Sequence, residues 1–360
     1  MQLLRQSWRE FADKECGTYS PLYAAICRSV ADDPELLALG AAAPPSGQQP
    51  NVLLAAVHYL VLGGLAHPLA DVYAGAADPA DAPALFRDLC LSQRDDIARL
   101  LATRHTQTNE PGRTGPLAVG LAVAAGLVGE PIGLLDADCS ARLNLLIDHY
   151  RFAYGSTPGP GPADSPVTVD CELRGKAPVP ERLPTIAARL GIDRAPVDVA
   201  RPDDGRWLLA CVWPDTARLA RTAAAIELAR RHPPRTIAGD MVDDLDAALD
   251  TFDPDLPIVV ITTSACAYLS AEQRHAFLAV LERRARRQPL AWLSVEQAGV
   301  VDIVPVPSLR RPAGTEASVM GLVTFEAGTA AGRALARCHA HGAWMEWVDE
   351  PPMFQPASAS

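Results

Sequence analysis

The sequence contains almost no lysine: Lys14 and Lys176 are its two lysines, and arginine supplies the rest of the 32 basic residues. This imbalance is typical of coding bias in a GC-rich genome, so the use of arginine carries little physical meaning by itself. The eight cysteines include no CxxC pair. This absence argues against a zinc site and a disulfide framework, and it favours reduced, buried thiols.

Long apolar runs and a secretory leader are also missing. No stretch reaches the about 20 apolar residues that span a bilayer, and the start MQLLRQSWREFADKEC lacks the basic, apolar and small-residue order of a signal peptide. Basic charge is scarce, because 43 acidic residues outnumber the basic ones and give a formal net charge of −11, which repels phosphate backbones. We therefore expect a cytoplasmic protein that binds a small molecule or another protein, and neither nucleic acid nor a membrane.

The chain has enough material for two ordinary globular domains, with 360 residues of which 49% are apolar and 21% charged. Apolar residues at helical spacing predict an N-terminal helical domain over residues 1–128. The expected helices are Leu3–Glu15, Pro21–Val30, a short helix capped within Asp32–Glu35 and ending at Leu39, a buried helix within 51–64, Phe86–His105 and Leu117–Val128.

From Pro131 onward, short apolar runs alternate with amphipathic ones, which predicts an α/β domain with a parallel sheet over residues 129–350. Residues 178–205 are expected to be an insertion with one short helix at 184–190, and residues 351–360 a disordered tail. The expected strands are Ile132–Ala137, Val167–Leu173, Arg235–Ala238, Ile258–Thr263, Leu290–Val295 and Val319–Phe325. The expected helices are Ala141–Phe152, Asp215–Arg231, Asp243–Leu249 and Ala271–Arg286.

The first stretch with chemical potential is PIGLLDADCSARLNLLIDHYRFAYG, residues 131–155, where a strand runs into a tight turn and then a helix. Such a turn exposes helix-start amides to which the polar end of a cofactor can bind, provided that the turn residues are small. We expect Asp136 to Asn144 to form this bend.

This stretch resembles the cofactor-binding turn of S-adenosylmethionine (SAM)-dependent methyltransferases. It is more closely similar to the bacterial family catalogued as domain of unknown function 2332, in which an acid and a small glycine-containing turn precede SAGLNLL. Further similarity lies in TQTNEPGR (106–113), in RLGIDRAPVDV and RWLLACVWPD (189–215), and in AYLSAEQR and AWLSVEQ (267–297). The resemblance covers nearly the whole chain and implies a class I methyltransferase-like, Rossmann-like doubly wound sheet with an N-terminal helical domain.

The resemblance also implies SAM as cofactor, with Asp136, Ser140 and Asn144 in the matching positions of the turn. Asp138 and Arg142 depart from it, because the family has glycine or another small residue there, and glycine lets a cofactor lie against the backbone. Asp138 would then border the cofactor, while Arg142 either grips an anionic substrate as a fork-shaped donor or is a surface arginine.

Further contacts with the cofactor are expected where other strands end. Glu172 follows the predicted second strand and would accept hydrogen bonds from ribose hydroxyls, with Asp193 as its rival. Asp240 follows the third strand, where an adenine ring would lie, or else caps a helix. Ser264 follows the strand IVVITT, and because no GxSxG elbow surrounds it, hydrolase chemistry is not indicated.

A dense polar cluster, TNE with a nearby arginine, lies between the helical part and the sheet. Glu110 is the predicted general base, with Asn109 and Arg113 orienting the substrate, and Thr108 is a predicted substrate contact. The alternative is a structural ion pair between Glu110 and Arg113.

Two aromatic residues and a histidine pair complete the candidates. Tyr268 could face the ligand or cap the core, and Trp213 could wall the pocket or be structural. His339 and His341 form an HxH pattern with no third ligand at a known spacing, so we expect no metal.

We therefore expect a methyltransferase-like enzyme that transfers a methyl group from SAM to a small molecule, with Glu110 taking a proton from the acceptor. One alternative is a SAM-independent enzyme of specialised metabolism that catalyses elimination or intramolecular displacement on an anionic substrate held by Arg142 and Arg113. Another is a non-catalytic partner subunit. The sequence leaves open a homo-oligomer or a small partner subunit.

Overall fold

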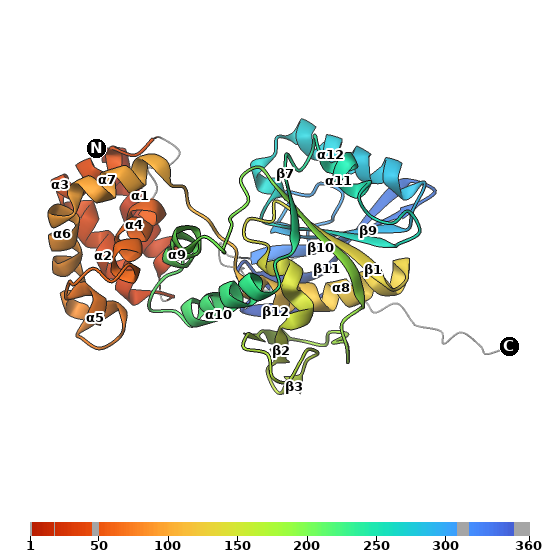
Figure 1. Cartoon of the computed structure of the whole chain (residues 1–360), viewed down its shortest axis with the longest axis horizontal. Coiled ribbons are helices and arrows are strands. Elements are labelled where there is room, and N and C mark those ends of the chain that lie inside the picture. Colours follow the sequence, from red (N-terminus) through yellow and green to blue (C-terminus); the bar gives the residue numbers. More distant parts are fainter. Residues whose placement is uncertain (1, 18, 45–49, 308–316, 349–360) are drawn as a thin grey trace. The chain divides into compact units, whose positions relative to one another are not determined.

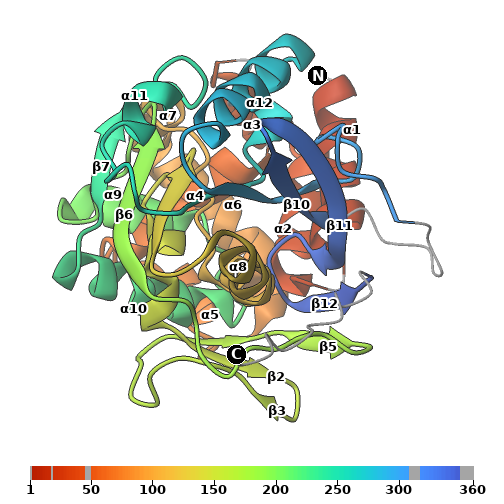
Figure 2. The same cartoon turned by 90° about the vertical axis from the view of Figure 1, so that its right-hand side faces the viewer.

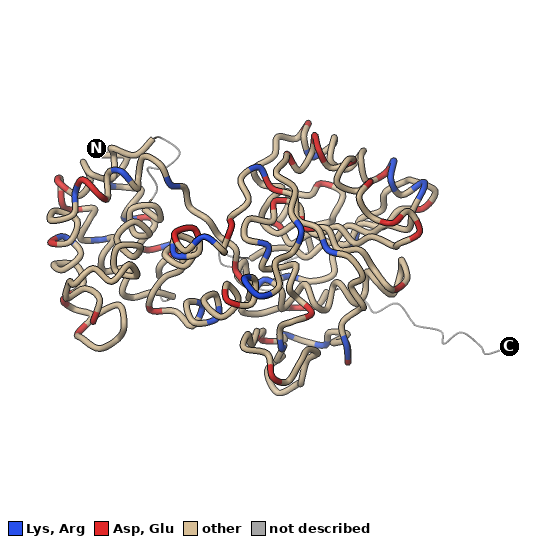
Figure 3. The backbone as a smooth tube through the Cα atoms, viewed as in Figure 1, with Lys and Arg blue, Asp and Glu red and all other residues tan. Residues whose placement is uncertain are grey.

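The computed structural model describes residues 2–17, 19–44, 50–307 and 317–348. The chain forms two compact units. The helical unit comprises 1–109 and 197–230, and the sheet unit comprises 110–196 and 231–360. These limits differ from the predicted boundary at 128/129, because residues 110–128 pack on the sheet and 197–230 return to the helices. The predicted tail, 351–360, lies outside the described residues. Acidic and basic residues are interspersed in both units (Figure 3).

Helices make up the helical unit around an apolar core that includes Trp8, Tyr23 and Phe86. The predicted cap of the short helix α3 (Pro34–Ala41) is present, because the Asp33 side chain accepts hydrogen bonds from the amides of Glu35 and Leu36. The predicted single helix Phe86–His105 is wrong, because the backbone leaves helical geometry at Gln93 (φ −113°, ψ 28°). The elements are α1 (Gln2–Glu10), the π-helix η1 (Phe11–Cys16), α2 (Pro21–Asp32), α3 (Pro34–Ala41), α4 (Pro50–Leu62), α5 (Leu69–Tyr73), the 3₁₀ turn η3 (Pro79–Asp81), α6 (Ala82–Ser92), α7 (Arg94–Thr103), α9 (Pro202–Ala210) and α10 (Arg218–Arg231).

The sheet unit is a mixed α/β structure whose described residues form a mostly parallel nine-stranded sheet of order β5-β12-β11-β10-β9-β8-β1-β6-β7. The strands from β9 to β7 in this order run parallel, and β10, β11 and β12 form antiparallel pairs. Their bounds are β1 (Ile132–Ala137), β5 (Glu172–Arg174), β6 (Ile186–Asp193), β7 (Arg235–Ala238), β8 (Ile258–Thr263), β9 (Leu290–Gln297), β10 (Ala317–Glu326), β11 (Thr329–His339) and β12 (Trp344–Trp347).

Helices cover both faces of this sheet. Helix α8 (Thr114–Val128) lies on one face, and α11 (Leu245–Leu249) and α12 (Ala271–Ala285) lie on the other (Figure 1, Figure 2). Leu135 and Ala137 of β1 belong to the core formed with α11 and α12. Because side chains alternate along a strand, Asp136 between them points to the face of α8.

Two further predicted elements are wrong because regular structure is interrupted inside them. Helix Ala141–Phe152 is replaced by the 3₁₀ helix η5 (Leu143–His149) and by β2 (Arg151–Tyr154), because Arg142 is left-handed and Leu146 leaves helical dihedrals. Strand Val167–Leu173 is interrupted at Cys171. Its halves are β4 (Thr168–Asp170), which joins a small sheet with β2 and β3 (Thr157–Pro158), and β5 of the main sheet.

The predicted insertion at 178–205 contains a central strand, β6, instead of the helix at 184–190. Its sequence IAARLGID has the alanine and arginine content of a helix, but its partners decide the conformation. Leu190 pairs in register with Leu135 of β1 on one side and with Arg235 of β7 on the other. The predicted strands at β1, β7 and β8 are confirmed, and β9 and β10 extend slightly beyond their predicted ends.

Candidate active site

The carboxyl ends of β1, β8 and β9 carry a cluster of buried polar residues in the sheet unit. In open α/β sheets, ligands bind outside the carboxyl ends of the parallel strands. Helix α8 begins at the same end, with Arg113 at its N-cap position. Asp136, Ile261 and Leu293 form one row across β1, β8 and β9, and Gly120 of α8 packs on Leu293.

Asp136 is the central residue of this cluster. Its side chain is 1% exposed, and neither carboxylate oxygen has a partner at hydrogen-bond geometry among the described residues. Burial raises the pKa of Asp136 well above its usual range, and the charges of Asp138 and Asp193 raise it further. The Asn144 amide and the Arg113 guanidinium only partly offset this rise. Burial and the neighbouring carboxylates therefore favour the protonated, uncharged form of Asp136.

Asn144 and Arg113 are held beside Asp136 by the end of β8. The Asn144 amide donates to Oγ1 of Thr263 at 3.1 Å, while its own carbonyl oxygen is buried and has no hydrogen-bond partner in the described ranges. Arg113 donates through Nη1 to the carbonyl oxygen of Thr263 at 3.3 Å and through Nε to that of Ala340 at 3.1 Å. The site thus joins a buried carboxyl group, an amide and a guanidinium.

Glu296 is a second buried acid at this end of the sheet. One of its carboxylate oxygens accepts hydrogen bonds from the amides of Ala265 at 3.0 Å and Cys266 at 3.2 Å. Burial raises the pKa of Glu296, and these amides and Arg113 lower it by less. Ser264, just before these amides, has a left-handed backbone with φ 56°.

The turn after β1 has the backbone of a glycine-rich turn without the glycines. Asp138, Ser140 and Arg142 have φ values of 68°, 46° and 67°. A left-handed residue with a side chain costs about 1–2 kcal/mol, so the predicted bend is present and strained. Asp193 holds it through a hydrogen bond from the Ser140 amide at 2.7 Å. Arg142 donates to Oγ1 of Thr236 on β7, so its side chain extends toward β7.

Three acids lie at the ends of β1, β6 and β7. Although Asp138 reaches solvent, burial and then the charges of Asp193 and Asp240 raise its pKa to about 6, partly offset by Arg194. Asp240 forms an ion pair with Arg194 and accepts hydrogen bonds from the amides of Val242 and Asp243. These carboxylates make this end of the sheet acidic.

Asp138→Asn is expected to stabilise the protein above pH 6 by about 1 kcal/mol, once solvent screening is allowed for. The folded pKa, about 6, lies above the ordinary 3.8. The penalty for the charge therefore appears as pH rises between these values and persists above them. Asparagine tolerates the left-handed backbone equally well. Urea unfolding at pH 4 and pH 8 measures the gain, with the surface variant Asp170→Asn as control; an equal gain at both pH values would contradict the charge account.

The structure gives several predicted site residues surroundings that differ from the predicted ones. Glu172 lies on the edge strand β5 and pairs with Arg174, so its predicted position after the strand beside β1 is wrong. That strand is β6, which ends in Asp193. Tyr268 is 84% exposed. Glu110 accepts a hydrogen bond from the Gly112 amide and thereby caps the turn Pro111–Arg113.

The remaining predictions fall in the helical unit. Thr108 and Asn109 are its last residues before the sheet unit. Trp213 packs against three rings of the same unit, with centroid distances of 5.9 Å to Phe11, 5.7 Å to Tyr19 and 5.7 Å to Tyr23. This arrangement supports the structural alternative for Trp213.

Glu296 and Thr263 were missed by sequence reasoning. Both occupy the ends of apolar strands, AWLSVEQ and IVVITT, and polar residues at strand ends are the signal that could have identified them.

In the described part of the chain, no three or more His, Cys, Asp or Glu side chains are placed to hold a metal ion. Likewise, no described helix is both long and apolar enough to cross a membrane.

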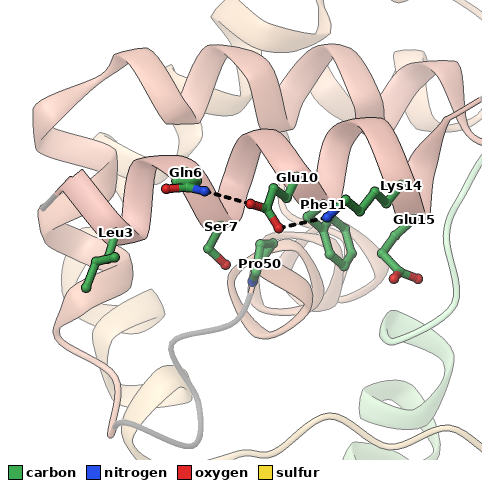
Figure 4. A pocket seen from close by; sticks show the side chains of 8 residues that line it. All are labelled: Leu3, Gln6, Ser7, Glu10, Phe11, Lys14, Glu15 and Pro50. Carbon is green, nitrogen blue, oxygen red and sulfur yellow. Dashed lines mark hydrogen bonds and ion pairs between the residues drawn. The ribbon is translucent and has the colours of Figure 1, made fainter.

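The helical unit has a depression with a volume of about 420 Å³. It is lined mainly by α1 and η1 with Pro50 (Figure 4). Glu10 accepts hydrogen bonds from Gln6 at 2.8 Å and from Lys14 at 3.0 Å. Because its central acid is paired and open to solvent, this depression offers less for catalysis than the sheet unit.

Comparison with known proteins assigns the chain to a family without adding an activity. None of the curated proteins matches the sequence. The family described as "Uncharacterized protein conserved in bacteria (DUF2332)" matches residues 5–347, nearly the whole chain. The protein therefore belongs to this bacterial family.

Proposed function

We propose that the protein is an enzyme acting on a small anionic molecule, with Asp136 as a bifunctional acid–base group and without SAM. The observation that carries the proposal is the buried Asp136 carboxyl with both oxygens unpartnered in the described residues. Leaving a buried polar group unpaired costs about 1–3 kcal/mol. A protein retains such a group where a ligand completes its hydrogen bonds or where its proton is used.

The two oxygens suit elimination or intramolecular displacement. In elimination, the protonated oxygen of Asp136 gives its proton to the leaving group as the bond from carbon to that group breaks. The other oxygen takes the proton from the neighbouring carbon, whose electron pair forms the double bond. In displacement, that proton comes from the attacking heteroatom. The carboxyl ends protonated in both reactions, so no co-reactant is needed.

Neighbouring residues supply orientation in this proposal. Arg113 attracts the anionic group of the substrate, and Asn144 has an unpartnered carbonyl oxygen to accept a hydrogen bond. Glu110, the base expected from the sequence, is replaced in this role by Asp136 because Glu110 caps a turn. Arg113 replaces Arg142 as the anion ligand because its charge acts on Asp136, whereas the Arg142 side chain extends to Thr236 on β7.

The residues where the resemblance would place SAM do not fit it well. Both oxygens of Asp193, at the position for ribose, accept backbone amides, from Ser140 and Ala195. Asp240, at the position for adenine, is engaged by Arg194 and two amides. Asp138 adds negative charge where the carboxylate of methionine would lie.

Methyl transfer from SAM is the second candidate. In chain order, the parallel strands are arranged 3-2-1-4-5, as in Rossmann-like sheets. The left-handed turn after β1 also has the backbone of a cofactor-binding turn. Both features favour descent from a methyltransferase-like scaffold, and the side chains then favour a different reaction.

Incubation with a bacterial small-molecule extract, followed by mass spectrometry, tests the proposal. We expect the protein to form a product that is lighter than its substrate by the leaving group and a proton, or an isomer of the substrate where the leaving group stays attached through another bond, while Asp136→Asn forms none. Asp170→Asn is the matched control and should behave like the unchanged protein. Calorimetry with SAM and its demethylated product should show no binding at millimolar ligand. A product heavier by one methylene group, formed only with added SAM, would establish the second candidate instead.

A further inference from the structure

The loop after β8 combines backbone strain with a buried acid that holds it in place. Ser264 adopts a left-handed conformation at φ 56°, and its amide donates to the carbonyl oxygen of Val295 at 2.9 Å. The next two amides, of Ala265 and Cys266, both donate to one carboxylate oxygen of Glu296. Residues of β9 thus accept hydrogen bonds from three successive amides. These bonds hold Ser264 in its strained left-handed conformation.

This loop directly continues the candidate active site. The residue before Ser264 is Thr263, whose side chain is bonded by Asn144 and whose carbonyl oxygen is bonded by Arg113. The Ser264 side chain is partly exposed, and its hydroxyl forms no hydrogen bond within the described ranges of the chain. Ser264 is thus a strained residue whose hydroxyl is unpartnered among the described residues, next to the one residue, Thr263, that binds both Arg113 and Asn144, and it is placed to meet a ligand.

We propose that the Ser264 hydroxyl binds the anionic group of the substrate together with Arg113, and that Glu296 is the positioning residue that holds Ser264 in its left-handed conformation. The first half rests on the proposed function, and the second does not. The ligand group is an oxyanion such as a carboxylate, because a hydroxyl and a guanidinium both donate hydrogen bonds to it.

Two substitutions at Ser264 separate strain from binding. Ser264→Gly removes both the hydroxyl and the penalty for the left-handed backbone, so it should raise the Tm by about 2 °C and raise the KM about tenfold. Ser264→Ala removes the hydroxyl and keeps the strain, so it should raise the KM equally with no gain in Tm. An unchanged KM in both variants would overturn the contact.

Two substitutions at Glu296 test its positioning role without any substrate. Glu296→Gln retains an oxygen that accepts from the amides of Ala265 and Cys266, whereas Glu296→Ala removes it. Hydrogen exchange measured by NMR should accelerate at least tenfold at these two amides in Glu296→Ala and stay near the native rate in Glu296→Gln. The KM should rise in the alanine variant and be rescued in the glutamine variant.

The exchange measurement also separates this inference from the proposed function. Unchanged exchange at Ala265 and Cys266 in a folded Glu296→Ala variant would overturn the positioning role, whatever the activity. If Glu296→Ala fails to fold, slower exchange at these amides than at the amide of the exposed residue Ala267 in the unchanged protein supports the hydrogen bonds, and equal exchange contradicts them. Absence of turnover by the unchanged protein would overturn the proposed function and the substrate contact together, while the exchange result would still decide the role of Glu296.

Discussion

Asp136→Asn is expected to produce a protein that is more stable than the original at pH 8 and inactive. Burial and the carboxylates of Asp138 and Asp193 raise the folded-state pKa of Asp136 well above its usual range. In the unfolded chain the same carboxyl ionises near pH 4. Between the two pKa values the folded state binds the extra proton, so the free energy of unfolding falls as pH rises.

The neutral asparagine does not have this penalty. The stability difference between Asp136→Asn and the unchanged protein should therefore grow by about 1.4 kcal/mol for each pH unit between the unfolded and folded pKa values. Urea unfolding at several pH values from 5 to 8 measures it, with Asp170→Asn as the surface control. Turnover should be lost at every pH, because asparagine cannot exchange a proton. A stability difference that does not change with pH would show that Asp136 is not held uncharged.

Gly342→Ala should lower the free energy of unfolding by about 3 kcal/mol and impair the site. Gly342 has φ 76°, where only glycine is relaxed, and an added Cβ would lie 1.8 Å from the carbonyl oxygen of Gly112. The colliding atom is backbone and cannot rotate away, so overpacking of about 1–3 kcal/mol adds to about 1 kcal/mol of backbone strain. The same turn carries Ala340, whose carbonyl oxygen accepts from Arg113, so Arg113 should shift as well.

The matched control for this substitution is Gly299→Ala. Gly299 has a similar φ of 82°, but nothing lies within 4 Å of an added Cβ. It should lose about 1 kcal/mol from strain alone, and its turnover should be unchanged. Denaturant unfolding of both variants separates the two contributions. Equal losses at Gly342 and Gly299 would mean that the turn between β11 and β12 yields to the added methyl group, and the predicted shift of Arg113 would not follow.

Sequence reasoning was most accurate where local pattern and tertiary environment agree. The apolar runs of β1 and β8 are buried on both sides of the sheet, and such runs are typical of parallel strands. It failed at β6, whose composition favours a helix but whose backbone is fixed by pairing with β1 and β7. The helix predicted after β1 failed because the left-handed Arg142 has no distinctive local signal.

For the candidate site, the sequence indicated individual residues better than their arrangement. Asp136, Asn144 and Arg113 were identified from motifs, and the structure brings them to the end of β8. Glu172 follows the more strand-like run and is therefore preferred to Asp193 from the sequence, but that run is split into β4 and β5, and Asp193 ends β6 beside β1. Glu296 could not be identified as a site residue from the sequence. Its role depends on its burial and on hydrogen bonds from the amides of Ala265 and Cys266, and no sequence pattern encodes these.

Infrared spectroscopy tests directly whether Asp136 is uncharged. A protonated carboxyl absorbs at a higher frequency than a carboxylate, and carbon-13 labelling of aspartate shifts the bands of aspartate away from those of glutamate. At pH 7, subtraction of the Asp136→Asn spectrum from that of the unchanged protein should leave a band of a protonated aspartic acid, which persists in deuterated buffer with a small isotope shift. A difference spectrum at pH 7 that contains only carboxylate bands would contradict the account.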